Sequence, residues 1–189
     1  MVTIRLERPV DEAAREALLD TAYGPVRHQK PSARLRRGRL PADGLSFVAI
    51  ERGRMVGTVR LWPVNAGRKR PALLLGPLAV HPQARNRGIG SALMQRALDV
   101  ASCHGHDAVL LVGDEAYYRR FGFSAEKTAP LTLAGADPAR LLARELKPGA
   151  LDGAHGRISA SGARTAIPAL AAFGPLTGQH AAGLLPHAA

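Results

Sequence analysis

An arginine- and glycine-rich segment carries the clearest chemical signal in this sequence. It reads Arg-Asn-Arg-Gly-Ile-Gly at residues 85–90 and follows an almost continuous apolar stretch, 72–80. Helical spacing of apolar residues begins at Ile89, so the segment should form the loop between a buried strand and a helix. Free N–H groups and the dipole at a helix start attract anions, and glycines let a phosphate reach the backbone. Because two arginines add positive charge at the rim, the pattern predicts a site for a phosphate-bearing ligand.

Residues 85–90 also match the Gln/Arg-x-x-Gly-x-Gly/Ala pattern of the GCN5-related N-acetyltransferases, the GNAT family. The preceding Leu-Gly-Pro-Leu-Ala-Val-His-Pro, residues 75–82, is similar to the family's central splayed strand. A second segment, Gly113–Phe123, resembles the family's Tyr-x-x-x-Gly-Phe element, in the form typical of small bacterial YhbS-like predicted acetyltransferases. The order of elements agrees with the family from about residue 3 to residue 160.

This resemblance implies an α/β (α+β) architecture, the GNAT fold. Its central sheet is mixed, mostly antiparallel and twisted, splays between the fourth and fifth strands, and is flanked by helices. The resemblance also implies an acyltransferase that moves an acetyl group directly from acetyl-CoA to an amine, with the loop holding the pyrophosphate. The residues expected to bind this cosubstrate are Leu78, Ala79, Val80, Arg85, Asn86, Arg87, Gly88, Ile89, Gly90 and Ser91.

Tyr118 is the candidate catalytic residue, because it stands four residues before Gly122, at the position of the family's general-acid tyrosine. A phenol is protonated at neutral pH and can donate a proton to the departing thiolate. The neighbouring Tyr117 is expected to pack in the core. A backbone N–H within residues 78–80, exposed where the strand splays, is expected to polarise the thioester carbonyl.

The general base that would deprotonate the acceptor amine has four candidates. Glu51 ends a strand and Asp114 starts a short helix, so each also fits a turn or capping role. Histidine is a side-chain type that commonly acts as a base near neutral pH, which makes His81 a candidate, although its place before Pro82 also fits the ordering of a loop. A bound water molecule is the fourth candidate.

Thiol and metal chemistry are not expected at this site. Cys103 is the single cysteine, lies at the end of the predicted long helix, and is expected to pack in the core. Direct acetyl transfer requires no thiol nucleophile. The seven histidines show no metal-ligand spacing, so the sequence predicts no metal.

The elements that position these residues follow from apolar periodicity and turn residues. Arg52-Gly53 should form a hairpin turn, and Pro77 should make its strand bulge or splay, because proline donates no ladder hydrogen bond. The elements predicted before the loop are helices over 11–23 and 32–37 and strands over 45–51, 54–62 and 72–80.

One segment after the loop gives conflicting signals. Asp137-Pro138 is a typical helix start, whereas the resemblance favours a strand over Leu141–Lys147 that pairs beside the strand at 107–112. We predict the strand, because tertiary pairing overrides a weak local propensity. The other elements predicted here are helices over 87–104 and 114–121 and strands over 107–112, from Gly122-Phe123, and over 156–160.

The composition predicts one globular domain. The chain has 189 residues, of which 46% are hydrophobic and 22% charged, which argues against disorder over the whole length. We expect a GNAT acetyltransferase domain at 1–160 and an Ala/Gly/Pro-rich C-terminal extension at 161–189. No apolar stretch approaches the roughly 20 residues of a membrane span, and the N-terminus has no apolar signal core. A cytoplasmic protein without a membrane partner is therefore expected.

The net charge of +11 is carried mostly by arginine, which suits either polyanion binding or a solvated surface. Because aromatic residues make up only 4% of the chain, stacking on single-stranded nucleic acid is not expected. The alternative function is a non-catalytic acyl-CoA-binding or basic nucleic-acid- or anion-binding module on the same fold. The predicted partner is a small-molecule or peptide amine that enters between residues 24–40 and 63–71, where a basic rim suits a carboxylate or phosphate. The apolar tail is a candidate homodimer interface.

Overall fold

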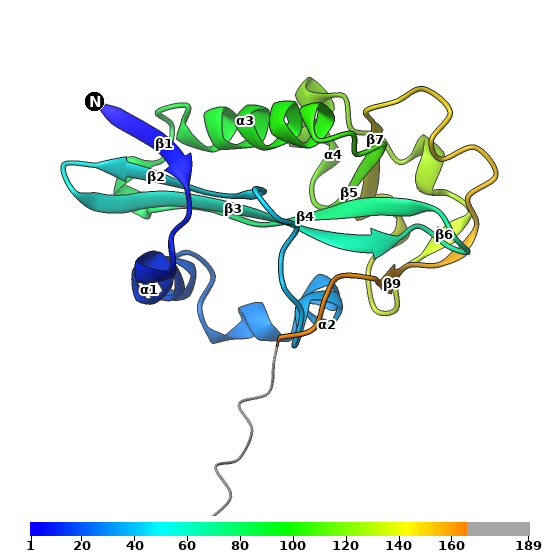
Figure 1. The fold of residues 1–189 in the computed structure, drawn as a ribbon, viewed down its shortest axis with the longest axis horizontal. Coiled ribbons are helices and arrows are strands. Elements are labelled where there is room, and N and C mark those ends of the chain that lie inside the picture. Colours follow the sequence, from blue (N-terminus) through cyan, green and yellow to red (C-terminus); the bar gives the residue numbers. More distant parts are fainter. Residues whose placement is uncertain (166–189) are drawn as a thin grey trace, which may run out of the picture.

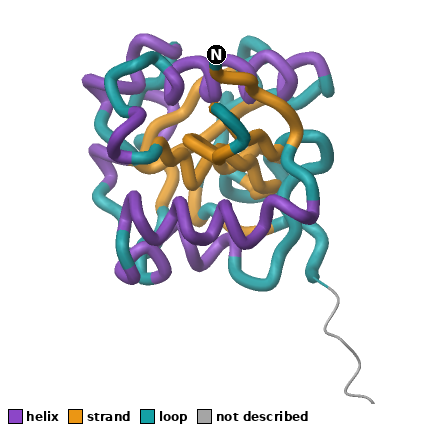
Figure 2. Tube along the Cα trace, turned by 90° about the vertical axis from the view of Figure 1, so that its left-hand side faces the viewer, coloured by secondary structure: helices purple, strands orange, loops and turns teal. Residues whose placement is uncertain are grey.

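The computed structural model describes residues 1–165 and arranges them in three layers, with a sheet between two groups of helices (Figure 1). Figure 2, turned by 90°, shows the strands stacked between the helical layers. The strands are β1 (Val2–Leu6), β2 (Ser46–Glu51), β3 (Arg54–Asn65), β4 (Pro71–Val80), β5 (Ala108–Val112), β6 (Leu131–Thr132), β7 (Leu141–Glu145), β8 (Gly156–Arg157) and β9 (Ser159–Ala160). The helices are α1 (Glu12–Tyr23) and α2 (Pro31–Arg36) below the sheet in Figure 1, and α3 (Ile89–Cys103) and α4 (Glu115–Tyr118) above it.

The central sheet has the order β1-β2-β3-β4-β5-β7, and β9 pairs with β3. All its pairs are antiparallel except β4 with β5, which is parallel. That parallel pair consists only of Leu73 with Val109 and Leu74 with Leu110. Beyond Leu74 the two strands separate, and β4 continues beside β3 as far as Val80. The predicted mixed, mostly antiparallel sheet, splayed between its fourth and fifth strands, is therefore confirmed.

Two apolar clusters, one on each face of the sheet, explain why β4 is apolar along most of its length. Leu73 and Leu75 belong to the cluster that includes the buried face of α3. Leu74, between them, belongs to the opposite cluster with Trp62 and Leu110. Successive side chains of a strand point to opposite faces, so a strand covered on both sides has no polar positions.

Leu141–Glu145 forms β7 and pairs antiparallel with β5 over its whole length, so the predicted strand is confirmed. The competing local signal is also real, but it lasts for one turn. The Asp137 carboxylate accepts the N–H of Ala139 at 3.0 Å and caps a short 3-10 helix, Pro138–Arg140. Pairing with β5 then directs the chain into the sheet.

One strand prediction and one packing prediction were wrong, and a second predicted strand is divided into two. Gly122 ends a 3-10 turn with a φ of 78°, and the chain after it makes only a single bridge, between Ser124 and Ala143, instead of a strand. Residues 156–160 form two short strands, β8 and β9, which pair with β6 and β3 respectively. Cys103 is exposed, because it lies two residues past the buried Ala101 and thus on the other side of α3.

The first residues of the predicted C-terminal extension lie against the domain. The N–H of Leu40 donates to the carbonyl of Ala163 at 2.8 Å, and the N–H of Thr165 donates to Gly38 at 3.1 Å. Residues 166–189, the rest of the extension, lie outside the described residues. A domain boundary at residue 160 and a tail that forms a dimer interface stay predictions.

Candidate active site

The loop before α3 has the geometry of an anion site. Gly88 precedes α3 with a φ of 75°, and a Cβ at this position would meet no protein atom within 4 Å, so the outer side of the loop is open. Ala92 donates to the carbonyl of Gly88 at 2.9 Å, and within the described residues the N–H groups of 89–91 have no protein acceptor. These free donors and the open loop suit a phosphate group.

The two arginines of this loop differ in their partners. The guanidinium of Arg87 makes two hydrogen bonds to Glu51, of 2.9 and 2.5 Å. This contact lowers the pKa of the Glu51 carboxyl, so Glu51 is held against the loop as an anion. Arg85 is exposed and has no carboxylate partner among residues 1–165. Glu51, which was predicted as one possible base, therefore pairs with Arg87, which was predicted to bind the cosubstrate.

The last residues of β4 expose main-chain groups where β5 diverges. The hydroxyl of Tyr23 donates to the carbonyl of Leu78, which places the main-chain groups of Leu78 on the side away from β3. Since peptide groups alternate along a strand, Val80 presents its N–H to the same side, and Ala79 faces β3. Leu78 and Val80 are thus the donors available at the opening, whereas Ala79 contributes to the ladder.

A cavity of about 340 Å³ lies at this opening. One wall comes from β4 and β5, and the other from α1, α2 and the turn between them. Tyr118, from the α3 side of the sheet, lines the same cavity as Tyr23 and Arg36 from the opposite side. The cavity therefore connects the two faces of the sheet through the gap between β4 and β5.

Tyr118 ends α4 and is half-buried, with its ring edge-on to Tyr117 at 4.9 Å between centroids. A Cβ at Gly113 would overlap the ring of Tyr118, so only glycine permits this close approach. Burial, with a smaller effect of nearby Tyr23, raises the pKa of Tyr118 to about 12. Within the described residues its hydroxyl has no hydrogen-bond partner, so a protonated phenol lines the cavity without a competing acceptor.

Tyr117 packs against Phe121 and the α3 cluster, as its predicted core role requires. Its hydroxyl lies 3.5 Å from the position of a Cβ at Gly90, close to the first turn of α3. The two adjacent tyrosines therefore face different places: Tyr117 faces the anion loop, and Tyr118 lines the cavity.

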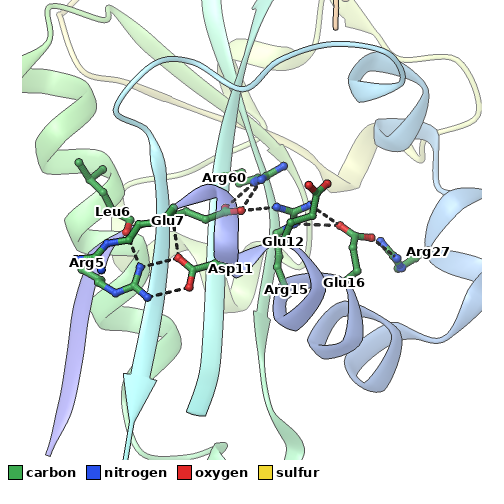
Figure 3. Close-up of polar contacts among 10 residues, drawn as sticks. Arg5, Leu6, Glu7, Asp11, Glu12, Arg15, Glu16, Arg27 and Arg60 are labelled. Carbon is green, nitrogen blue, oxygen red and sulfur yellow. Dashed lines mark hydrogen bonds and ion pairs between the residues drawn. The ribbon is translucent and has the colours of Figure 1, made fainter. Parts of the chain in front are cut away.

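A network of ion pairs holds α1 on the sheet (Figure 3). Four of its members line the cavity: Arg15, Glu16, Arg27 and Arg60. Arg15 is 4% exposed, and its guanidinium contacts the carboxylates of Glu7 and Glu16. Glu7 also accepts two hydrogen bonds from Arg60 of β3, of 2.8 and 2.5 Å. Glu16 accepts a hydrogen bond from Arg27 at 2.6 Å. The buried charges of this wall therefore compensate one another.

None of the predicted protein bases lies in the cavity. Asp114 caps α4, accepting the N–H of Ala116 at 3.0 Å, and His81 accepts the N–H of Gln83 at 3.3 Å. Glu16 is the carboxylate that does line the cavity. Burial opposes its charged form, but Arg27 and Arg15 outweigh burial, so the pKa of Glu16 lies below its usual value. Such a carboxylate is a weak base, and the identity of the base stays a prediction.

The structure also corrects the predicted rim of the acceptor site. Residues 24–40 line the cavity, but the loop at 63–71 does not. Instead, Lys69 and Arg70 line a separate surface depression near Asp107 and Lys147. Tyr23 and Arg36 were not predicted as individual site residues, because their only signal in the sequence was their place in or beside the basic 24–40 segment.

The described part of the chain shows neither a metal-ligand cluster nor a membrane-spanning helix. Residues 1–165 contain no group of three or more His, Cys, Asp or Glu side chains placed to hold a metal ion. In this part of the chain, no helix has both the length and the apolar character needed to cross a membrane.

Comparison with known proteins identifies close similarity to acetyltransferases. The model of the Acetyltransferase (GNAT) family matches residues 12–123. The "Uncharacterized N-acetyltransferase YhbS" of Escherichia coli K12 is 32% identical over 121 residues, which are 64% of this chain and 72% of that protein.

Solved structures show the same similarity. The crystal structure of the GNAT family N-acetyltransferase YhbS from Escherichia coli, in complex with CoA, has a TM-score of 0.72 and 30% identity. That match covers 85% of this chain and 89% of YhbS. A GNAT family acetyltransferase from Brucella melitensis, in complex with acetyl-CoA, has a TM-score of 0.65 and 28% identity and covers 85% and 96% of the two chains.

Proposed function

This chain belongs to the Acetyltransferase (GNAT) family and is an N-acetyltransferase, and from that premise we propose that it moves an acetyl group directly from acetyl-CoA to an amine of a small molecule or peptide. The CoA bound to YhbS and the acetyl-CoA bound to the Brucella protein support this cosubstrate. The alternative of a non-catalytic binding module has no support among these relatives. The observation that carries the proposal is the cavity at which the open side of β4 meets the hydroxyl of Tyr118, to which no residue of 1–165 is hydrogen-bonded.

The residues at the α3 loop fit the phosphates of acetyl-CoA. The open space beyond Gly88 admits a phosphate, and the N–H groups of 89–91 are free to bind it. Ile89 contributes only its backbone, since its side chain is buried in the core. The cosubstrate-binding residues proposed are Leu78 and Val80 at the opening, Ala79 between them, and Arg85, Asn86, Arg87, Gly88, Ile89, Gly90 and Ser91 at the loop.

Acetyl-CoA supplies an activated thioester when bound. The N–H groups of Leu78 and Val80 point away from β3 and stabilise the negative charge that develops on a carbonyl oxygen beside them. The amine nitrogen forms the new bond to the carbonyl carbon while the carbon–sulfur bond breaks. Tyr118 donates its proton to the departing sulfur, and the proton lost by the amine leaves through water and restores the phenol.

The test is transfer itself. The purified full chain is incubated with acetyl-CoA and a panel of small amines, peptides and acidic metabolites, and both free thiol and acetylated acceptor are measured. We expect at least one acceptor to release CoA and gain an acetyl group in equal amounts. Thiol release without acetylated product would indicate hydrolysis. Absence of both acetyl-CoA binding and thiol release would refute the proposal.

A further inference from the structure

The cationic side chains around the cavity fall into two groups. Arg15, Arg27 and Arg60 have carboxylate partners within the ion-pair network between α1 and the sheet. Lys30, Arg36 and the exposed Arg37 also line the cavity, but within residues 1–165 no carboxylate oxygen lies within 4.0 Å of any of the three. The second group is therefore charge without compensation inside the described protein.

Arg36 lies against the strand at the point where the sheet opens. A Cβ at Gly76 would lie 3.4 Å from Nη1 of Arg36, so the guanidinium rests on the backbone of β4. Trp62 fixes this part of β4, because its Nε1 donates to the carbonyl of Gly76 at 2.6 Å. Arg36 is half-buried, and burial lowers its pKa to about 10. A partly desolvated guanidinium without a carboxylate gains more from an incoming anion than an exposed one does.

Lys30 extends the same positive surface. Its Nζ lies 4.0 Å from the ring centroid of Tyr23, the residue that binds Leu78. Burial and then the nearby Arg36 and Arg140 lower the pKa of Lys30. An anion placed there would interact with Arg36 and Lys30 together.

The chain itself offers little to neutralise this charge. Glu16 is the only carboxylate that lines the cavity in the described part of the chain, and it is already bound by Arg15 and Arg27. Residues 166–189 contain no aspartate or glutamate. A bound anionic molecule would therefore supply a charge that the described carboxylates do not.

We propose that the acceptor is a small amine that also carries an anionic group, a carboxylate or a phosphate, and that Arg36 is the residue that binds this group. This inference rests on the proposed function, because it places the amine at Tyr118 and the anion at Arg36 in one cavity. A volume of about 340 Å³ suits a small molecule. Arginine binds carboxylates and phosphates through paired hydrogen bonds, which makes Arg36 a specificity-determining residue.

Matched acceptor pairs test the inference. Glycine is compared with glycinamide, and phosphoethanolamine with ethanolamine, in the transfer assay with acetyl-CoA. We expect the anionic member of at least one pair to have a kcat/KM about 10- to 100-fold higher, as the loss of a charge-assisted hydrogen bond predicts. The pair that shows the preference distinguishes a carboxylate from a phosphate. Equal rates for both members of both pairs would overturn the inference while leaving acetyl transfer intact.

Variants of α2 show whether Arg36 is responsible. Arg36→Gln should remove the preference by raising KM for the anionic acceptor, with the KM for acetyl-CoA unchanged, and Arg36→Lys should restore part of it. Arg34→Gln is the matched control, because Arg34 is exposed on the same helix and does not line the cavity. A preference that persists in a folded Arg36→Gln would overturn the assignment.

A binding measurement gives an answer independent of turnover. Trp62 is the only tryptophan and lines the cavity, so its fluorescence reports occupancy. N-acetylglycine should change this fluorescence at lower concentration than N-acetylglycinamide, and Arg36→Gln should abolish the difference. Equal affinities, or no binding of either compound, would count against the inference even if the enzyme acetylates neutral amines. Failure to bind or consume acetyl-CoA would instead refute the proposed function.

Discussion

Arginine serves two regions of this molecule in different ways. At the loop before α3, Arg85 and Arg87 are exposed, and the free N–H groups of the helix start supply most of the anion site. Below the sheet, Arg15 is buried between Glu7 and Glu16. The loop is a local surface structure, whereas the ion-pair network between α1 and the sheet joins residues from several elements.

This difference determines how each region tolerates change. Exposed charges are screened by water and salt, so removing a partner at the loop should alter ligand binding more than stability. A buried charge that loses its partner destabilises the fold, because water cannot replace the partner. Substitutions matched between the two regions should separate these effects.

The largest effect is expected at Tyr118, which lines the same cavity as Arg15 and Glu16. Tyr118→Phe keeps the ring and its packing on Tyr117 and Phe123 but removes the proton donor. We expect kcat to fall about 10²–10⁴-fold with little change in acetyl-CoA affinity. Single-turnover rates should be measured as well, because slow product release would hide part of the loss. Tyr117→Phe is the control, and a Tyr118→Phe enzyme as fast as wild type would make Tyr118 a packing residue.

The pH dependence of the rate tests the role of Tyr118 in a second way. Because burial raises the pKa of Tyr118 to about 12, its donating form persists throughout the neutral and mildly alkaline range. The rate should therefore show no alkaline decline from Tyr118 below about pH 11. A decline near pH 10 that disappears in Tyr118→Phe would contradict this prediction.

Glu7→Gln should produce the largest loss of stability. Glu7 is 5% exposed at its side chain and pairs with both Arg15 and Arg60. Removing its charge leaves buried Arg15 with weaker compensation, and we expect unfolding free energy to fall by about 3 kcal/mol. Denaturant titration measures this loss. Glu115→Gln, which breaks the exposed pair with Arg119, should change stability by less than about 0.5 kcal/mol. Equal effects of the two substitutions would contradict the contrast between buried and exposed pairs.

Gly88→Val should weaken acetyl-CoA binding. A branched side chain would occupy the open space beyond the loop, where a phosphate needs the backbone. The loss of one or two charge-assisted hydrogen bonds predicts about 10- to 100-fold lower affinity by calorimetry.

A control at the other end of α3 separates ligand exclusion from backbone strain. Gly105 has a φ of 76°, nearly that of Gly88, and a Cβ there would also meet no atom within 4 Å. Gly105→Val should therefore cost similar stability and leave acetyl-CoA affinity unchanged. Circular dichroism checks that both variants fold. An unchanged affinity in Gly88→Val would place the phosphates elsewhere.

The same contrast explains what the sequence could predict. The 85–90 loop and Tyr118 lie in short segments with recognisable spacing, and most elements follow from apolar periodicity. The loop before α3 and the strand at Leu141–Glu145 therefore lie where they were predicted, whereas anion binding at 85–90 stays a prediction. The prediction of a strand from Gly122-Phe123 was wrong, because a glycine that ends a 3-10 helix has the same local sequence pattern as one that precedes a strand.

The cavity wall could not be predicted in the same way. Glu7, Arg15, Arg27 and Arg60 meet only after α1 has packed on β3, and no local pattern encodes that contact. Arg36 was one of several arginines in a basic segment, and nothing in its neighbours distinguished it from exposed Arg34. Burial and pairing decide their roles, and both are tertiary properties.

The smallest expected effect is at the pair formed by Glu51 and Arg87, the counterpart at the loop of Glu7 and Arg15. The Glu51 carboxylate holds the Arg87 guanidinium and also places a negative charge near the predicted phosphate site. Glu51→Gln should therefore leave stability close to wild type and raise acetyl-CoA affinity up to about 5-fold, because Arg87 becomes free to bind phosphate. Calorimetry at low and high salt measures this gain, which should shrink with salt because these groups are exposed. The paired variant Arg87→Gln should lower affinity by a similar small factor. If Glu51→Gln instead weakened binding, Glu51 would serve to orient Arg87 toward the phosphates. The exposed pair at the loop would then need both of its charges, as the buried pair of Glu7 and Arg15 does.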